Sequence, residues 1–163
     1  MSPSATTSPL VLGRHLHEFL YSPDIFALLD PHGCGWLDGG CRILADAVGL
    51  WLAIDYRAAL VDVAGHAQHS FIMVDDWYID GDGISRPDTF LRRWRDLEGV
   101  DGHVVKDGIA LIVASHMRNS WSMPQDMILS RHLAGLIDTK LPATMVLSAL
   151  RRPRIATLKN NRP

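Results

Sequence analysis

Hydrophobic residues at helical spacing mark the first half of the chain. Apolar side chains recur three and four positions apart over residues 13–21, which predicts a helix there, and a second short helix restarts at Pro23. Nearly every position of residues 41–54 is apolar. A helix that is hydrophobic on all sides is buried, so we expect this one to cross the centre of the domain. Between these helices, residues 30–40 contain one proline and four glycines and are expected to form a loop.

The strand signals follow directly after the central helix. Short runs of apolar and β-branched residues favour strands, and Asp75-Asp76 falls between two such runs as a tight turn, which predicts a hairpin. A second hairpin is predicted around Asp107-Gly108. The expected strands cover residues 58–64, 69–74, 77–80, 103–106 and 109–114.

Three further helices are predicted in the second half. Ser85-Arg86-Pro87-Asp88 has the residues of a helix start, and this helix should run to Glu98 and stop at Gly99. Ser122-Met123-Pro124-Gln125 has the pattern of a capping box for a helix to about Ile137, and a last helix is expected over 143–150. The order of elements predicts an α+β fold in which a central helix packs on a mainly antiparallel sheet.

Length and composition suit one domain with a substantial core. The chain has 163 residues, of which 47% are hydrophobic. We expect a flexible leader over 1–12, one domain over 13–150 and a flexible tail over 151–163 that carries five basic residues and no acid. The tail could alternatively dock a partner, and the oligomeric state stays open.

Charge and hydropathy exclude several classes of protein. With 16 basic and 18 acidic residues, nothing global indicates binding to nucleic acid or to an anionic membrane. No 18-residue apolar run predicts a transmembrane helix, and the first residues lack the pattern of a signal peptide. We therefore expect a cytoplasmic protein in which Cys34 and Cys41 form no structural disulfide. Phosphate-binding and dinucleotide motifs are absent from the sequence, so no cofactor is expected.

Cys41 is the candidate nucleophile. It follows Gly39-Gly40 and opens the central helix, where the positive end of the helix dipole favours a thiolate and free backbone amides can bind an oxyanion. The double glycine would also let a substrate approach closely. Trp36, in the preceding loop, and Gln68 are further candidates for substrate contact, although Trp36 could equally cover the core. A buried cysteine without a catalytic role is the alternative interpretation of Cys41.

His69 and Asp80 are the candidate base and its orienting carboxylate. They lie at the start of one strand and the end of the next, and the turn between them should make the two residues cross-strand neighbours on one face. A thiol needs a neighbouring imidazole, and the imidazole needs a carboxylate to fix its tautomer. The three residues therefore predict a Cys-His-Asp triad.

The same residues carry a resemblance to a known superfamily. Gly40-Cys41 with its apolar helix, then Gln68-His69-Ser70-Phe71-Ile72-Met73-Val74 and Trp77-Tyr78-Ile79-Asp80-Gly81-Asp82-Gly83, resembles the papain-like cysteine hydrolases over roughly residues 33–98. The order of parts is similar to that of the transglutaminase-like, arylamine N-acetyltransferase and NlpC-type groups. The resemblance implies a papain-like fold with Cys41 as nucleophile, His69 as general base and acid, and Asp80 as orienter.

Two other arrangements of side chains compete with this triad. His103 could pair with Asn119, which begins an Asn-Ser-Trp segment that resembles the one orienting the histidine in papain. A metal site could use ligand types among His32, Cys34, Cys41, His66 and His69. However, two histidines three apart on a strand point to opposite faces, so we expect no metal.

The sequence thus predicts a thiol hydrolase or acyl-transferase that acts on a peptide, isopeptide or side-chain amide bond, with a protease or amidase favoured. Its partner would be a protein or peptide substrate. The alternative is an inactive binding or inhibitor protein that keeps the scaffold to recognise a macromolecule. The sequence does not choose between cleavage, deamidation and transfer.

Overall fold

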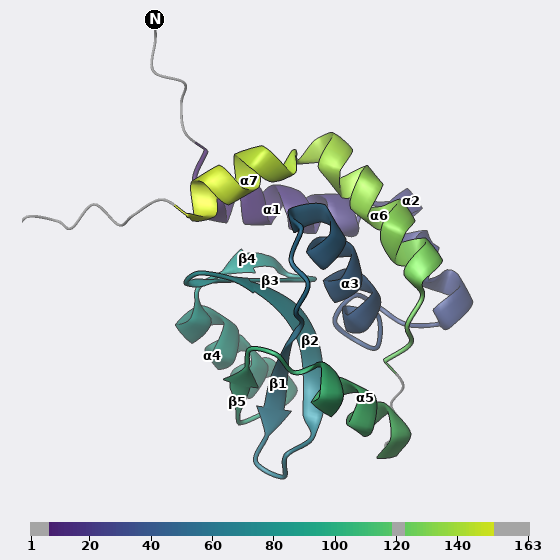
Figure 1. The fold of residues 1–163 in the computed structure, drawn as a ribbon, viewed down its shortest axis with the longest axis vertical. Helices are drawn as coiled ribbons and strands as arrows, with labels where there is room; N and C mark the ends of the chain where they lie inside the picture. The colour runs from purple at the N-terminus through teal and green to yellow at the C-terminus, as the bar shows by residue number, and fades with distance from the viewer. Residues whose placement is uncertain (1–6, 119–122, 152–163) are drawn as a thin grey trace, which may run out of the picture.

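The computed structural model describes residues 7–118 and 123–151 and shows a mixed α+β fold (Figure 1). Its centre is a five-stranded sheet in the order β4-β3-β2-β1-β5, with every neighbouring pair antiparallel. The strands are β1 (Ala58–Asp62), β2 (Ala67–Val74), β3 (Trp77–Asp80), β4 (Gly83–Ser85) and β5 (Gly102–Val105). The predicted antiparallel sheet is therefore confirmed.

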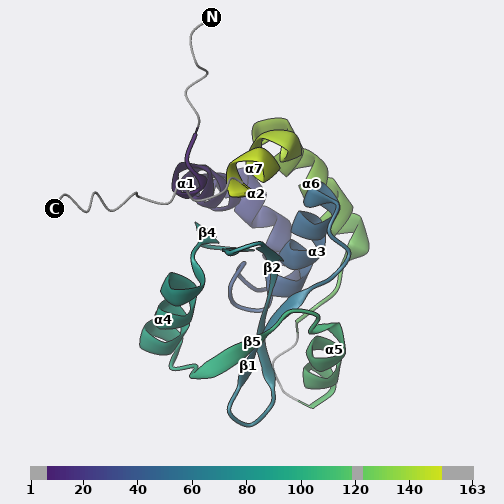
Figure 2. The ribbon, with the colours of Figure 1, turned by 60° about the vertical axis from the view of Figure 1, so that its left-hand side comes forward.

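Helices cover both faces of the sheet. The described helices are α1 (Pro9–Leu20), α2 (Pro23–Phe26), a 3-10 helix (Ala27–His32), α3 (Cys41–Leu52), α4 (Pro87–Glu98), α5 (Ile109–Arg118), α6 (Met127–Lys140) and α7 (Ala143–Leu150). Figure 2 shows α4 on one side of the sheet and α3 and α5 on the other. The central helix predicted over 41–54 is α3, which is buried along most of its length between the sheet and α6.

The predicted hairpin of β2 and β3 is present, but its register does not place His69 directly opposite Asp80. Asp75 in the turn has a positive φ of 49°, and Val74 pairs with Trp77. Continued along the ladder, this register sets Asp80 opposite Phe71. His69 then lies two residues from Phe71 on the same face, so it is a diagonal neighbour of Asp80 and does not stand directly opposite it. Diagonal neighbours remain within reach of long side chains.

The predicted strand over 109–114 is wrong, because this segment is the first part of α5. The chain leaves the sheet at Gly108, whose amide donates a 2.7 Å hydrogen bond to the carbonyl of Arg57 and whose carbonyl accepts from Ile112. A side chain at residue 108 would place its Cβ 2.4 Å from that of Ala59, so glycine is required for this close approach. A short apolar run does not distinguish strand from helix, and here the tertiary contacts select a helix.

Several helix starts also differ from the sequence prediction. Helix α1 begins at Pro9, where the Ser8 hydroxyl accepts from the Val11 amide, so the predicted leader over 1–12 is too long. Helix α6 is capped by Asp126, which accepts from the Leu129 amide at 2.9 Å; Ser122 of the predicted capping box lies outside the described residues. Its end is also later than predicted, at Lys140.

Helix α4 ends as predicted and begins without the expected cap. Gly99 has a φ of 67° and terminates the helix, since glycine adopts the left-handed conformation without strain. The N-cap is Arg86, whose side chain makes no capping hydrogen bond, and Ser85 belongs to β4. Helix α7 covers the predicted residues 143–150.

The described part of the chain contains no single helix that is both long and apolar enough to cross a membrane. Helices α6 and α7 reach the required length only together, and they meet at a bend of 76°. Helix α7 buries Val146, Ala149 and Leu150 in the hydrophobic core that it shares with α1 and α3.

Two glycines in helices give a direct test of the packing between α1 and β4. A Cβ at Gly13 would lie 2.6 Å from the backbone nitrogen of Ile84, whereas a Cβ at Gly135 would meet nothing within 4 Å. We expect Gly13→Ala to lower the free energy of unfolding by about 1–3 kcal/mol through overpacking. Gly135→Ala should instead raise it by about 0.5–1 kcal/mol, because alanine is the better helix former. Urea unfolding of both variants measures the difference, and equal effects would contradict the close contact.

Candidate active site

Cys41 is the first residue of α3, and the two glycines before it set the path of the chain into the helix. The N-cap Gly40 offers no side chain to the helix amides, and Gly39 before it has a φ of 90°. A Cβ at residue 40 would lie 2.7 Å from the carbonyl oxygen of Gly35, so the turn requires glycine there. The first amides of an α-helix have no partner inside the helix. With no capping side chain, those around Cys41 are suited to bind a negatively charged oxygen.

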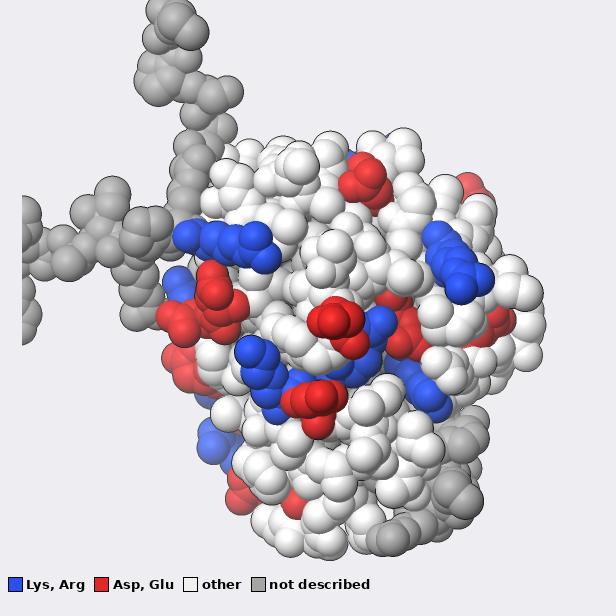
Figure 3. Space-filling model, viewed as in Figure 1, with Lys and Arg blue, Asp and Glu red and all other residues white. Residues whose placement is uncertain are grey.

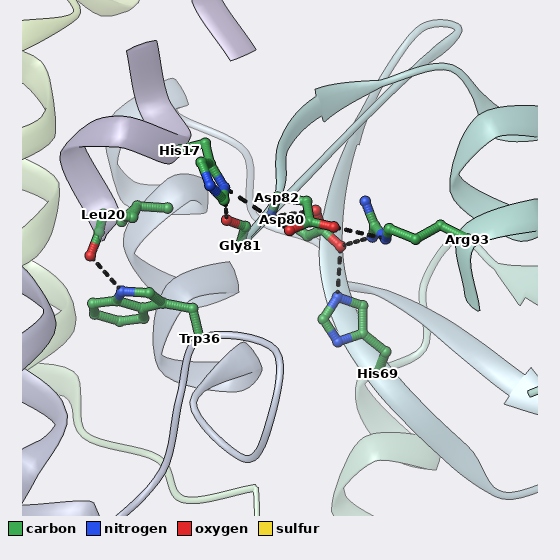
Figure 4. Close-up of polar contacts among 8 residues, drawn as sticks. All are labelled: His17, Leu20, Trp36, His69, Asp80, Gly81, Asp82 and Arg93. Atoms are coloured by element: carbon green, nitrogen blue, oxygen red, sulfur yellow. Dashed lines mark hydrogen bonds and ion pairs between the residues drawn. The ribbon is translucent and has the colours of Figure 1, made fainter. Parts of the chain in front are cut away.

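His69 and Asp80 form a buried pair behind this helix start. The Nε2 atom of His69 lies 3.0 Å from Oδ2 of Asp80, and the two side chains are 0% and 1% exposed (Figure 4). The other carboxylate oxygen of Asp80 accepts a 3.0 Å hydrogen bond from the Asp82 amide. The contact predicted between residues 69 and 80 is therefore present, made along the diagonal of the hairpin.

An irregularity in β2 precedes the histidine. His69 pairs with Leu60 on β1, but the next pair joins Ala67 to Val61, so Gln68 is an extra residue in β2. Such bulges redirect the neighbouring side chains of a strand. Gln68 donates a 2.6 Å hydrogen bond to Asp62, which ties down the bulge. The structure thus gives Gln68 a partner within the β1–β2 hairpin, and its predicted contact with substrate remains untested.

The surroundings of His69 favour the protonated, imidazolium form of its ring. Burial lowers the pKa of His69, but its hydrogen bonds and charge interactions with Asp80 and Cys41 outweigh burial and raise the pKa from 6.5 to about 9. Burial alone would raise the pKa of Asp80; hydrogen bonding to His69 and the positive charges of His69 and Arg93 instead hold it below its usual value. At neutral pH the pair is therefore an imidazolium next to a carboxylate.

The thiol of Cys41 acts on the same imidazole ring. Because Nε2 faces Asp80, Nδ1 is the ring nitrogen left to face the thiol. Nδ1 is buried and meets no partner at full hydrogen-bond geometry, while the nearby thiol contributes to the raised pKa of His69. Hydrogen bonds between a nucleophile and its base are often loose before substrate binds. Cys41, His69 and Asp80, predicted from residues far apart in the sequence, are thus brought together in this order.

Aromatic side chains enclose the imidazole on the side of α4. The ring of Trp94 lies 4.3 Å from that of His69 between centroids, and Phe71 and Phe90 each lie at 6.0 Å. These neighbours exclude water from the His69–Asp80 hydrogen bond. A hydrogen bond in such a low-dielectric environment is electrostatically stronger than one in water.

Arg93 is a neighbour of this pair that the sequence analysis did not single out. Arginine is mostly found exposed, yet Arg93 donates from its Nη2 to Asp80 and pairs through Nε with Asp82 at 3.0 Å. Its side chain is only 16% exposed. The available signal was its position in the helix: Phe90 and Trp94 flank it at the spacing of one helical face.

Trp36 does not line an open surface. It is fully buried, and its indole nitrogen donates a 2.8 Å hydrogen bond to the carbonyl of Leu20 (Figure 4). Of the two interpretations offered by the sequence, the structure places Trp36 in the core, where it supports the loop before α3. It has no exposed surface with which to contact a substrate.

The competing arrangements receive less support. His103 is exposed on β5 and pairs through its backbone with Val61, while Asn119 lies outside the described residues. His66 lies 3.8 Å from Asp62, and His32 is 3.2 Å from Asp126, so these histidines have acidic partners of their own. Over residues 7–118 and 123–151, no group of three or more His, Cys, Asp or Glu residues is placed to hold a metal ion.

Cys41 itself is covered in this structure. Only 2% of its surface is exposed, and it packs with Ala59 and Val61 of β1, Ile112 of α5 and Met123. These apolar neighbours would have to move before another molecule could reach the thiol. On the face drawn in Figure 3, basic and acidic side chains are interspersed and do not form one field of a single sign.

Compared with protein-family models, with curated proteins and with solved structures, the chain matches none of them. Its function is therefore inferred from the geometry of its own residues.

The buried pair makes a prediction for stability against pH. A group whose pKa is raised by folding stabilises the protein below its unfolded pKa and loses that contribution as pH passes its folded pKa. For His69 this loss falls between pH 6.5 and about 9. We expect the free energy of unfolding, measured with urea at each pH, to decline over this range by a few kcal/mol at most.

A histidine variant supplies the control for this decline. His69→Gln removes the titrating group, so its stability should vary much less between pH 6.5 and 9 than that of the unchanged chain. A decline of the same size in both proteins would assign the effect to other groups. The lowered pKa of Asp80 acts in acid, where stability is lost as pH falls below its unfolded value near 3.8.

Proposed function

We propose that the protein is a cysteine-dependent hydrolase or acyl-transferase that acts on a peptide, isopeptide or side-chain amide bond. The observation that carries the proposal is the buried His69–Asp80 hydrogen bond of 3.0 Å beside a thiol at a helix N-terminus. Nucleophile, base and orienting carboxylate are the parts of thiol catalysis, and here they occur in contact with one another. The papain-like assignment belongs to the same proposal and rests on the order of these parts.

Acylation would use all three side chains. The sulfur of Cys41, having given its proton to His69, attacks the carbonyl carbon and forms a carbon–sulfur bond. The carbonyl oxygen becomes an oxyanion, which the free amides at the start of α3 stabilise. As the oxyanion collapses, the carbon–nitrogen bond breaks, and the imidazolium of His69 gives its proton to the leaving amine. Asp80 holds the ring in position throughout.

Deacylation decides the outcome of the reaction. If water is the acceptor, neutral His69 takes a proton from it, the new carbon–oxygen bond forms, and the Cys41 thiolate leaves. The net reaction is then amide hydrolysis, by a protease or amidase. We favour this outcome because the domain is small. An amine acceptor in place of water gives acyl transfer at the same site. The substrate in either case is a protein or peptide.

A second function is supported by the burial of Cys41. A thiol that is 2% exposed and enclosed by apolar neighbours suits a structural role, in which His69–Asp80 is only a buried polar pair. The protein would then bind or inhibit a macromolecule by means of its surface. The chemical reactivity of Cys41 distinguishes this candidate from the enzyme.

The chain contains an internal reference for that reactivity. Cys34 is half-buried, and burial followed by the charge interactions of Cys41 and Asp38 raises the pKa of its thiol. We expect iodoacetamide to alkylate Cys41 well below pH 8 and faster than Cys34, although Cys41 is the less exposed of the two. Peptide mass spectrometry after timed exposure measures both rates in one sample.

Two variants complete the test. His69→Gln should slow alkylation of Cys41 and leave that of Cys34 unchanged. Cys41→Ala should abolish any product formed on incubation with candidate proteins, where intact-mass spectrometry separates cleavage, a deamidation shift and cross-linking. If Cys41 reacts only at alkaline pH, and no faster than Cys34, the enzyme proposal fails and the binding function is favoured.

A further inference from the structure

Behind the triad, helix α4 presents one arginine to the orienting carboxylate. Arg93 contacts Asp80 on Oδ2, the same oxygen that accepts from His69, while its Nε pairs with Asp82 at 3.0 Å (Figure 4). The Asp82 amide in turn donates to Oδ1 of Asp80 at 3.0 Å. Both oxygens of the carboxylate are thus held, and the guanidinium is fixed at two points.

We infer that Arg93 is a positioning residue that fixes the orientation and the ionised state of Asp80 and thereby sets the reactivity of Cys41 through His69. This inference rests on the proposed thiol chemistry and adds Arg93 to the three residues of the proposed triad. Arg93 does not reach the reacting atoms itself, since Asp80 and His69 lie between it and the thiol.

Burial creates the need for such a cation. Asp80 is 2% exposed and lies on a sheet face packed with Phe71, Phe90 and Trp94, where an ionised carboxylate is costly without compensating charge. A neutral carboxylic acid would hold an imidazolium far less well than a carboxylate does. The guanidinium keeps the proton off Asp80 at the pH where His69 must act.

The surroundings favour Arg93 as the source of this charge. The guanidinium of Arg93 lies over the ring of Phe90, with its central carbon 5.1 Å from the ring centroid. His17 of α1 lies 3.9 Å from Asp82 and 3.3 Å from the carbonyl of Gly81, so it is directed at the turn after β3. The titratable and charged groups that face Asp80 or its partners are His69, Arg93, Asp82, His17, Tyr21 and, through His69, Cys41.

The test compares alkylation of Cys41 by iodoacetamide between pH 4 and 9 in full-length variants. Arg93→Gln removes a positive charge, and this raises the pKa of the neighbouring titratable groups. The acid limb of the rate profile should therefore move up by about 1–3 pH units. At a fixed pH on that limb, alkylation should slow about tenfold or more. Arg93→Lys keeps the charge, so its rate profile should lie close to that of the unchanged chain. Circular dichroism confirms folding of each variant.

Two comparisons separate positioning from a general effect of charge. Arg95→Gln changes an arginine of the same helix that is exposed and pairs with its neighbour Asp96, so its profile should overlay that of the unchanged chain. In an Asp80→Asn background, Arg93→Gln should cause no further shift, because its effect passes through the carboxylate. A profile of Arg93→Gln that overlays the unchanged one, or a shift of equal size in the Asp80→Asn background, overturns the inference.

A measurement on the unchanged chain needs no variant. The side-chain ¹⁵N resonances of Arg93 should shift with pH over the range in which the alkylation rate rises, and resonances that stay flat there contradict the coupling. This outcome is separate from the fate of the proposed function. If Cys41 shows no enhanced reactivity, the enzyme proposal fails, while the Arg93 titration still reports whether the arginine and the Asp80 carboxylate act together.

Discussion

The hydrogen bond between His69 and Asp80 is the interaction on which the site depends. Neither side chain reaches solvent, so each must satisfy the other's charge. A buried imidazolium without a carboxylate would lose its proton, and a buried carboxylate without a cation would gain one. The sheet meets this constraint by placing the two residues on adjacent strands and on one face, and α4 closes that face with aromatic rings and a guanidinium.

The remaining architecture serves to bring a thiol to this pair. Helix α3 packs along the sheet with Cys41 at its N-terminus, and Gly39 and Gly40 allow the chain to enter the helix without a capping side chain. The helix dipole and the imidazolium then act on Cys41 from two directions. The apolar cover over the sulfur, contributed by Ile112 and Met123 among others, keeps water out at the same time as it limits access.

Much of this arrangement could be predicted from the sequence, because local signals fix it. The apolar run after Gly40 predicts α3, and the Asp75-Asp76 turn between two apolar runs predicts the β2–β3 hairpin and thus the approach of residues 69 and 80. The α5 helix could not be predicted, since the choice of a helix at 109–114 depends on how closely Gly108 packs against Ala59 of β1. The bulge at Gln68 depends likewise on pairing with β1. The contact of Arg93 with Asp80 could not be predicted, because a surface arginine and one that reaches a buried carboxylate have the same sequence signature, and only the fold of α4 over β3 separates them.

The contact of α1 with β4 has a consequence for how sequence variation would affect the site. Gly13 and Gly83 meet backbone to backbone, and the same pair of elements directs His17 towards the turn that contains Gly81 and Asp82. A larger residue at either position would push the first helix outwards and displace the turn whose Asp82 amide donates to Asp80. Substitutions at these two glycines should therefore disturb the surroundings of Asp80, although neither glycine belongs to the proposed triad.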